Sequence, residues 1–287
     1  MRLLNKNINI LIVGLGLIGG SYARALTRQG FHVSAITRSQ SSIDYALNEG
    51  IIEKGSAGID PELISSSNLI IFSLYPKIFI QWIEDNQKYF SPGTIITDVT
   101  GVKQEIVKPI QDILRDDVEF IAAHPMAGRE VYGVQNSDDS IFRNANYIVT
   151  PTEKNTEEAI ELCEDLGRLL GFASVSRLSP DEHDDMIGFL SQLTHCIAVS
   201  LMTCNNSPNL EKYTGDSFRD LTRIARINDS MWSELFLMNK ETLLKNMELF
   251  EKEFCRLKDA LKNDDTETMR EMMRLSTERR ALFDKKK

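Results

Sequence analysis

One histidine in this chain stands where its side chain could do acid–base chemistry. His124 directly follows Glu119–Ala123, a mostly apolar stretch of strand length. An imidazole exchanges a proton near neutral pH, and ligands of an open α/β sheet bind at the carboxyl ends of its strands. His124 is therefore predicted to be catalytic, as a general base or hydrogen-bond acceptor. The alternative is a core histidine with a purely structural role.

A glycine pattern near the N-terminus predicts a nucleotide site. Gly14-x-Gly16-x-x-Gly19 follows the apolar run Ile8–Val13 and leads into a helix. The first glycine permits a tight turn, the second lets the backbone approach a pyrophosphate, and the third lets the helix pack closely on the strand. Unpaired N–H groups at the helix start favour the anion. The residues expected to contact the cofactor here are Gly14, Gly16, Leu17, Ile18 and Gly19.

The end of the expected second strand, Phe31–Ile36, bears on the choice between the two nicotinamide cofactors. In NAD-binding proteins of this type, an acid about twenty positions past the glycines bonds the ribose hydroxyl. Here the strand runs into Thr37-Arg38-Ser39, where the arginine and the serine offer a guanidinium and a hydroxyl to a 2′-phosphate. We expect these three residues to contact the cofactor, with NADP preferred to NAD. A solvated turn with an incidental arginine is the alternative.

A further cofactor contact is expected after the buried strand Asn68–Leu74. The carboxyl end of that strand should lie beside the nucleotide. Ser73, Leu74 and Tyr75 are therefore expected to contact it, although Tyr75 could equally be a packing residue.

Short apolar stretches alternate with helical segments up to residue 178. Strands are expected near Ile51–Ile52 and over Gly93–Asp98, Glu119–Ala123, Asn146–Thr150 and Ala173–Ser176, with a helix over Thr156–Leu170. This alternation predicts an α/β fold with a doubly wound, mostly parallel Rossmann-type sheet. Residues 1–178 are expected to form the dinucleotide-binding domain.

From Ser179 onward the pattern is helical. Ser179, Pro180 and Glu182 form a helix start with a capping box, and the helix that follows, to about Cys204, is apolar on nearly every face. Such a helix should be buried all round, in a bundle core or at a subunit interface. Further helices are expected over 241–262 and 264–283. Residues 179–287 are predicted to be an all-helical substrate and dimerisation domain, and a homodimer would supply the burial that so short a domain lacks.

The composition of the chain argues against several classes of binding partner. With 33 basic and 42 acidic residues the net charge is −9, which argues against general binding to nucleic acid or to anionic membranes. No apolar run is expected to reach the length needed to cross a bilayer. The four cysteines show no Cys-x-x-Cys pair and no zinc-like spacing, so no metal is expected and a cytoplasmic protein is predicted. A secretory signal starting at Arg2 and Lys6 is disfavoured, because three glycines interrupt its apolar run.

Several motifs, taken in order, resemble the prephenate dehydrogenase family of tyrosine biosynthesis. They are Gly14–Ser21, Asp98–Lys103, His124–Glu130 with its His-Pro-Met-Ala-Gly sequence, Glu182–Asp184, Leu193–His195 and Phe218–Ala225. The resemblance extends from Asn7 to about Lys240. It implies oxidative decarboxylation of prephenate to 4-hydroxyphenylpyruvate, with hydride transfer to NAD or NADP. We expect neither the regulatory domain nor the chorismate mutase segment that some relatives carry.

The resemblance also implies roles for residues that bind the substrate. Arg223 would hold a carboxylate of prephenate through its forked guanidinium. Glu130 and Asp220 would form a gate around that arginine, or pair with it structurally. His195 would contact the pyruvyl end of the substrate, and Trp232 would lie near the pocket or pack in the core.

Two positions depart from the family pattern. Many relatives carry a serine that orients the catalytic histidine and the nicotinamide, where this chain has Gly101 with Thr100 beside it. Thr100 and Gly101 are still expected at the cofactor. Gln192 replaces a histidine at the substrate, where it can donate and accept hydrogen bonds but carries no charge. Two alternatives stay open, an arogenate dehydrogenase and a nucleotide-binding regulator without activity.

Overall fold

The computed structural model describes residues 4–284, and the chain divides into two compact units, Met1–Asn239 and Lys240–Lys287. Arg2, one of the two basic residues of the possible secretory signal, lies outside the described residues. The expected domain boundary between residues 178 and 179 falls inside the first unit and stays a prediction.

The first unit is built on a parallel six-stranded sheet, as the sequence predicts. Its order is β3-β2-β1-β4-β5-β6, which is that of a doubly wound fold. The strands are β1 (Asn9–Val13), β2 (His32–Ile36), β3 (Lys54–Ser56), β4 (Leu69–Phe72), β5 (Ile95–Asp98) and β6 (Glu119–Phe120). Val13 lies beside Ile36 and Phe72, and Phe72 lies beside Asp98. The carboxyl ends of four strands therefore form one edge.

The third strand begins later than expected. Ile51 and Ile52 are buried but precede β3, because their N–H groups bond to the carbonyl of Ala46 at the end of the preceding helix. The sheet ladder starts only at Lys54, opposite Ser34. The apolar pair thus marks core packing and not strand pairing.

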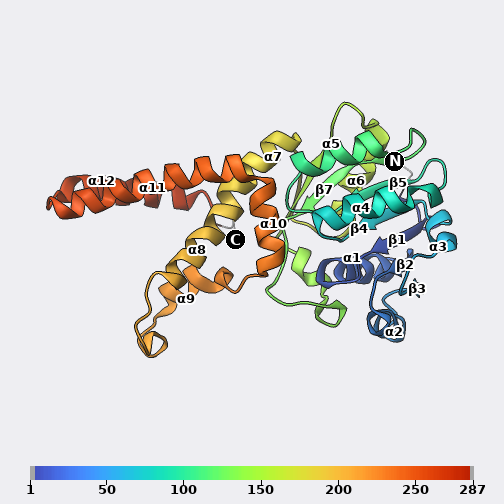
Figure 1. Cartoon of the computed structure of the whole chain (residues 1–287), viewed down its shortest axis with the longest axis horizontal. Helices are drawn as coiled ribbons and strands as arrows, with labels where there is room; N and C mark the ends of the chain where they lie inside the picture. Colours follow the sequence, from blue (N-terminus) through green and yellow to red (C-terminus); the bar gives the residue numbers. More distant parts are fainter. Residues whose placement is uncertain (1–3, 285–287) are drawn as a thin grey trace. The chain divides into compact units, whose positions relative to one another are not determined.

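Helices cover both faces of the sheet. On β1, Ile10 and Ile12 face one apolar cluster while Leu11 and Val13 face the other. The first cluster includes side chains of α1 (Leu17–Arg28), α2 (Gln40–Asn48) and α6 (Glu157–Leu169). The second includes side chains of α3 (Pro61–Ser65), α4 (Pro76–Asn86) and α5 (Gln104–Ile113). Figure 1 shows α1 on one side of β1 and β4, with α4 and α5 on the other.

A second, three-stranded sheet corrects the expectation of one strand over Glu119–Ala123. The chain leaves β5 after Ile121, whose N–H still bonds to the carbonyl of Ile96. It then pairs antiparallel with β8 (Asn146–Thr150) as β7 (Ala122–Pro125), and β8 pairs in parallel with β9 (Ser174–Arg177). His124 therefore lies within β7, past the carboxyl end of β6.

The helical part of the first unit begins as predicted, with the capping box of Ser179 and Glu182. It comprises α7 (Pro180–Ile187), a π-helical segment (Gly188–Leu193), α8 (Thr194–Thr203), α9 (Asp216–Thr222) and α10 (Asp229–Met238). The expectation of burial all round was wrong for the single chain, because Met186, Phe189 and Leu190 are about half exposed. Of the two environments considered, a subunit interface fits these exposed apolar side chains.

One stretch of the described chain, Pro180–Thr203, is long and apolar enough to cross a membrane, judged by length and composition alone. The expectation that no run reaches that length was therefore wrong, because α7, the π-helical segment and α8 join without a break. A single such stretch is weak evidence for a span. Gln192 within it is buried and bonded to the carbonyl of Leu235, as in a helix that packs against protein.

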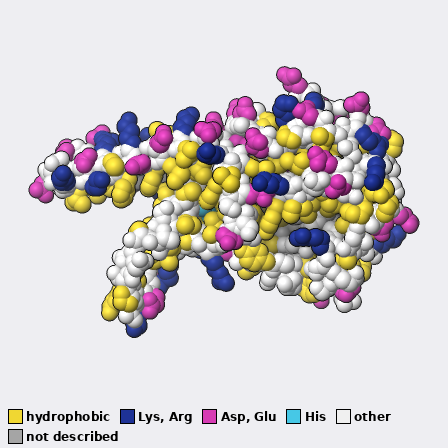
Figure 2. Space-filling view, in the orientation of Figure 1, with side chains coloured by type: hydrophobic (Ala, Val, Ile, Leu, Met, Phe, Trp, Pro, Cys, Tyr) yellow, Lys and Arg dark blue, Asp and Glu magenta, His cyan; other side chains and the backbone are white. Residues whose placement is uncertain are grey.

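The second unit contains α11 (Lys240–Lys262) and α12 (Thr266–Ala281), in agreement with the two helices expected there. Phe250, Phe254, Leu257 and Leu261 recur along α11 with helical spacing and are exposed. Figure 2 shows hydrophobic side chains along one side of this hairpin and charged ones along the other. The hairpin is thus amphipathic, with an uncovered apolar side.

Candidate active site

The turn between β1 and α1 has the geometry that a dinucleotide requires. Gly14 has φ +99°, and a Cβ there would lie 2.2 Å from the carbonyl oxygen of Ser73. A Cβ on Gly19 would lie 2.0 Å from the carbonyl oxygen of Gly14, so this position holds the helix against the strand. Beyond its two neighbours in the chain, no heavy atom of the described residues lies within 4 Å of the Cβ position of Gly16. The backbone at Gly16 is therefore open to a ligand, as the glycine pattern predicts.

The start of α1 is free to bind an anion. Gly16 is its N-cap, no side chain caps it, and its first turn contains no acidic residue. Gly16, Leu17 and Ile18 are partly exposed between buried neighbours. Unpaired N–H groups at a helix start bind phosphate, so these residues fit the pyrophosphate of a nicotinamide cofactor.

The segment after β2 presents a free cation. Arg38 is exposed and has no hydrogen bond or ion pair within residues 4–284. Ser39 caps α2, where its hydroxyl oxygen accepts from the N–H of Ser42, and the N–H of Thr37 donates to the carbonyl of Ser56. Of the three residues predicted to read the ribose, Arg38 therefore has its polar group uncommitted.

The end of β4 lies against the glycine turn. Ser73 donates its N–H to the carbonyl of Val13, and Leu74 lies 2.9 Å from the Cβ position of Gly14. The hydroxyl of Tyr75 accepts a hydrogen bond from Asn228 at 2.9 Å. Tyr75 thereby joins this edge to the start of α10, and the choice between packing and cofactor contact stays open.

His124 stands at the same edge as the glycine turn. The ends of β1, β4 and β5 are adjacent, which places them within about 10 Å. The loop after β5 then brings Gly101 against His124, because a Cβ on Gly101 would lie 3.8 Å from its Nε2 atom. His124 is partly exposed, so it is neither behind the strands nor remote from the nucleotide turn.

Two residues that were not among the predicted site residues support His124. Its Nδ1 lies 2.9 Å from Nε2 of His183, and Nδ1 of His183 lies 2.7 Å from Asp184. His183 and Asp184 are buried at the start of the helical part. In the sequence these two residues belong to the motif Glu182–Asp184, which contributes to the family resemblance. No local pattern around them predicts that they contact His124.

A buried ion pair lies beneath this group. Lys103 and Asp98 are fully buried, with 2.7 Å between Nζ and Oδ2, and Nζ also donates to the carbonyl of Ala123. The other oxygen of Asp98 accepts the N–H of Ala123 at 3.0 Å. This pair ties the loop after β5 to the strand that carries His124.

Thr100 belongs to the same network. Its hydroxyl bonds to the carboxylate of Asp98 and accepts from Lys103, and the residue is buried. The hydroxyl is therefore engaged beneath the site, and a contact of Thr100 with the cofactor stays a prediction. Gly101, which has no side chain, is the residue that faces His124.

The imidazoles of the site are held neutral. Burial lowers the pKa of His124 well below its ordinary value, and the neighbouring His183 and the Lys103 ammonium lower it further. Burial also lowers the pKa of His183, although Asp184 partly opposes this effect. A neutral His124 at pH 7 can accept a proton, as the predicted role requires.

Four of the predicted substrate-binding residues form two pairs, one by an ion pair and one by ring stacking. Arg223 and Glu130 form an exposed ion pair of 2.8 Å. His195 stacks on Trp232 with 3.7 Å between ring centroids, and its Nδ1 donates to the carbonyl of Ser191. Burial lowers the pKa of His195 first of all, and the charges of Glu130 and Arg223 also act on it. These four residues therefore lie together.

Gln192 is placed differently. It is buried, its amide nitrogen donates to the carbonyl of Leu235, and its amide oxygen accepts from Asn239, at 3.0 Å and 2.9 Å. Both polar atoms thus have partners within the chain, which holds the π-helical segment against α10. A contact with substrate stays a prediction for this residue.

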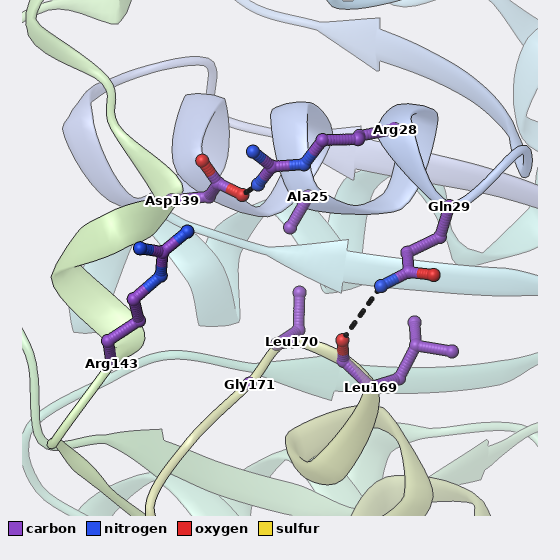
Figure 3. A pocket seen from close by; sticks show the side chains of 8 residues that line it. All are labelled: Ala25, Arg28, Gln29, Asp139, Arg143, Leu169, Leu170 and Gly171. Carbon is purple, nitrogen blue, oxygen red and sulfur yellow. Dashed lines mark hydrogen bonds and ion pairs between the residues drawn. The ribbon is translucent and has the colours of Figure 1, made fainter.

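A pocket at the other end of α1 is separate from this site. Figure 3 shows Arg28 paired with Asp139 at its wall, while Gln29 donates to the carbonyl of Leu169. These α1 residues are about three turns, or roughly 15 Å, from the glycine turn. The pocket is therefore not the nucleotide cleft.

Family models match nearly the whole chain. One described as "Prephenate dehydrogenase, nucleotide-binding domain" matches residues 22–175. One described as "Prephenate dehydrogenase, dimerization domain" matches residues 179–275.

Individual proteins are similar over most of their length. Prephenate dehydrogenase of Bacillus subtilis is 29% identical over 267 residues, which cover 91% of this chain and 72% of that protein. Prephenate dehydrogenase of Lactococcus lactis is 31% identical over 256 residues, 85% of this chain and 68% of that protein. The crystal structure of prephenate dehydrogenase from A. aeolicus, in complex with hydroxyphenyl propionate and NAD+, matches with a TM-score of 0.90 and 30% identity, covering 98% of this chain and 100% of that one.

Proposed function

Because the chain belongs to the prephenate dehydrogenase family, we propose that it converts prephenate to 4-hydroxyphenylpyruvate by oxidative decarboxylation. It is an oxidoreductase of tyrosine biosynthesis with a nicotinamide cofactor. The observation that carries the proposal is that His124 lies partly exposed beside the loop after β5, at the edge that holds the glycine turn.

The glycine turn, the start of α1 and the end of β4 would hold the cofactor, which accepts a hydride when bound. His124 takes the proton of the ring hydroxyl while the carbon that bears it becomes carbonyl-like. The electron pair of the bond to the departing carbon dioxide then enters the ring, and the proton returns to the oxygen of the new phenol. Aromatisation supplies much of the driving force, so the chain mainly positions the reactants.

Arg223 would bind a carboxylate of prephenate. Its guanidinium is exposed and paired with Glu130, so a substrate carboxylate would exchange with or share that partner. A local arginine is needed because the chain as a whole has a net charge of −9. The stacked pair of His195 and Trp232 lies next to it and would form a wall of the substrate site.

For the cofactor we propose a preference for NADP. Support comes from Arg38, exposed and without a partner in the described residues, and from the lack of a carboxylate in Thr37–Ser39. A guanidinium is suited to a 2′-phosphate.

We also propose a cytoplasmic homodimer. The family model over residues 179–275 is that of a dimerization domain, and apolar side chains of α7 and the π-helical segment are exposed in the single chain. Burial of such a patch in a second subunit would stabilise both. Four free cysteines are compatible with a reducing compartment.

The central test is a spectrophotometric assay of prephenate oxidation with His124→Asn. The proposal expects kcat to fall by about 10²- to 10⁴-fold, since a general base contributes that much. His32→Asn is the matched control, because His32 is an exposed histidine paired with Glu53. Unchanged turnover in His124→Asn would remove this residue from the reaction.

Arogenate is the second candidate substrate. It carries an ammonium in place of the keto group, and the carboxylate of Glu130 beside Arg223 could pair with it. Rates measured side by side on prephenate and arogenate decide between the two. Binding of the cofactor without turnover on either would instead support the regulator without activity.

A further inference from the structure

Three polar side chains extend in a line behind the active-site edge. His124 Nδ1 lies 2.9 Å from His183 Nε2, and His183 Nδ1 lies 2.7 Å from Asp184 Oδ1. His183 and Asp184 are inaccessible to solvent. With no water to exchange partners, each hydrogen bond must have one donor and one acceptor from within the chain.

The acidic end of the line is fixed by the start of α5. Asp184 accepts the N–H groups of Lys103 and Gln104, at 2.8 Å and 2.9 Å. Two N–H donors at a helix start favour the ionised carboxylate, which can only accept hydrogen bonds. Nδ1 of His183 must therefore carry the proton of the bond to Asp184.

The position of the proton on His183 determines the position of the proton on His124. A neutral His183 with its proton on Nδ1 has a bare Nε2, which can only accept. Nδ1 of His124 must then be the donor. In the neutral His124 ring this leaves Nε2 without a proton, on the side that faces Gly101.

The surroundings keep both rings neutral and leave Nε2 unobstructed. The groups that face them are the Lys103 ammonium, the carboxylates of Asp98 and Asp184, and each other. Gly101 offers no side chain that could hold Nε2 from the front. The orientation of the His124 ring therefore comes from its Nδ1 side.

We infer that His183 and Asp184 are positioning residues that hold His124 in the tautomer with a proton on Nδ1, so that Nε2 is the atom that accepts a proton from a ligand. The tautomer itself follows from the contacts within the chain. Its importance for turnover rests on the proposed function.

The first experiment is nitrogen-15 NMR of the ¹⁵N-histidine-labelled protein without ligands at pH 7. The chain has only four histidines, so single substitutions assign each ring. Protonated Nδ1 and bare Nε2 are expected for both His124 and His183. A proton on Nε2 of His124, or rapid averaging between its two nitrogens, would overturn the inference.

The second experiment uses His183→Gln, which leaves Asp184 on α7 with its bonds to the start of α5. The His124 signals should then change or average, whereas in the control His32→Gln they should keep their shifts. With prephenate, His183→Gln should lower kcat on the order of 10²-fold, as when a catalytic histidine loses its orienting partner, with KM and the Kd of the cofactor within about twofold. A normal kcat in this variant would refute the positioning role.

The outcomes separate the two proposals. If the wild-type protein shows the expected tautomer but does not oxidise prephenate, the proposed function fails and the tautomer assignment stands. If it oxidises prephenate and His183→Gln retains the wild-type rate and His124 signals, the inference fails and the proposed function stands.

Discussion

At the scale of single residues, the site combines histidines whose pKa is lowered with arginines that are exposed. Burial lowers the pKa of His124, His183 and His195 below the ordinary value of a histidine. Arg38 and Arg223 are exposed, and Arg223 is paired with Glu130. A phosphorylated cofactor would meet Arg38, which has no partner among residues 4–284, whereas a dianionic substrate would exchange with or share Glu130 at Arg223.

The cofactor preference is a prediction at this scale. Arg38→Ala should weaken NADP binding by about 10- to 100-fold, since a hydrogen bond to a charged group is worth roughly 1.5–3 kcal/mol. NAD binding should change by less than about twofold. Arg143→Ala, which removes the same charge beside the pocket at the far end of α1, is the control. Fluorescence titration with both cofactors measures this, and equal losses for NAD and NADP would show that Arg38 does not read the 2′-phosphate.

At the scale of elements, two connections set the geometry of the site. The turn from β1 to α1 shapes the nucleotide edge through three glycines that have different environments. The loop from β5 to α5 bonds to β7 through Asp98 and to α7 through Asp184. The base and the nucleotide turn are therefore held by the sheet and not by a flexible segment.

The glycines allow a paired prediction. Gly19→Ala should lower the free energy of unfolding by roughly 1–3 kcal/mol or more, because its Cβ would overlap backbone at Gly14. Gly16→Ala should leave stability within about 0.5 kcal/mol, because Gly16 has an ordinary φ of −99° and open space around it. It should instead weaken the cofactor about tenfold or more, or ~1.4 kcal/mol. Urea unfolding and cofactor titration of both variants test this, and a cofactor affinity unchanged in Gly16→Ala would contradict it.

Sequence reasoning succeeded where the signal is local. The β1–glycine–α1 unit, the capping box at Ser179 and the parallel sheet follow from spacing within short windows. The break between β6 and β7 has no such local signal. Both strands lie in one continuous apolar run, and only their pairing differs, because β6 pairs with β5 and β7 pairs with β8.

Long-range contacts account for the rest. His183 lies 59 residues from His124, and their contact depends on how α7 docks on the loop after β5. The π-helical segment likewise follows from packing, with Gln192 bonded to Leu235 and Asn239. Such contacts form only when distant parts of the chain come together. No short stretch of the sequence is therefore enough to predict them.

At the scale of the whole molecule, buried neutral histidines couple stability to pH. An unfolded histidine takes up a proton below about pH 6.5, whereas the folded rings resist it. In that range the unfolded state binds more protons, so the free energy of unfolding must fall as the pH falls. The loss continues until the pH reaches the lowered pKa values of the folded protein.

This gives a prediction for the intact protein. Between pH 7 and pH 5 the free energy of unfolding should fall, by up to ~1.4 kcal/mol per pH unit for each such histidine. His183→Gln should reduce this slope, because it removes one of the buried histidines. Carboxylates with lowered pKa values, such as Asp112 at about 2, lose their contribution only at lower pH. Urea unfolding at pH 7, 6 and 5 measures the slope, and a stability that is flat or rises toward pH 5 would refute it.

The burial of Lys103 has a consequence for chemical labelling. Its amine is enclosed together with Asp98 and has no solvent exposure. Acylating reagents that modify surface lysines reach this amine only in molecules that have opened. The acylated fraction of the peptide that contains residue 103 therefore reports how much of a sample has opened during the labelling time.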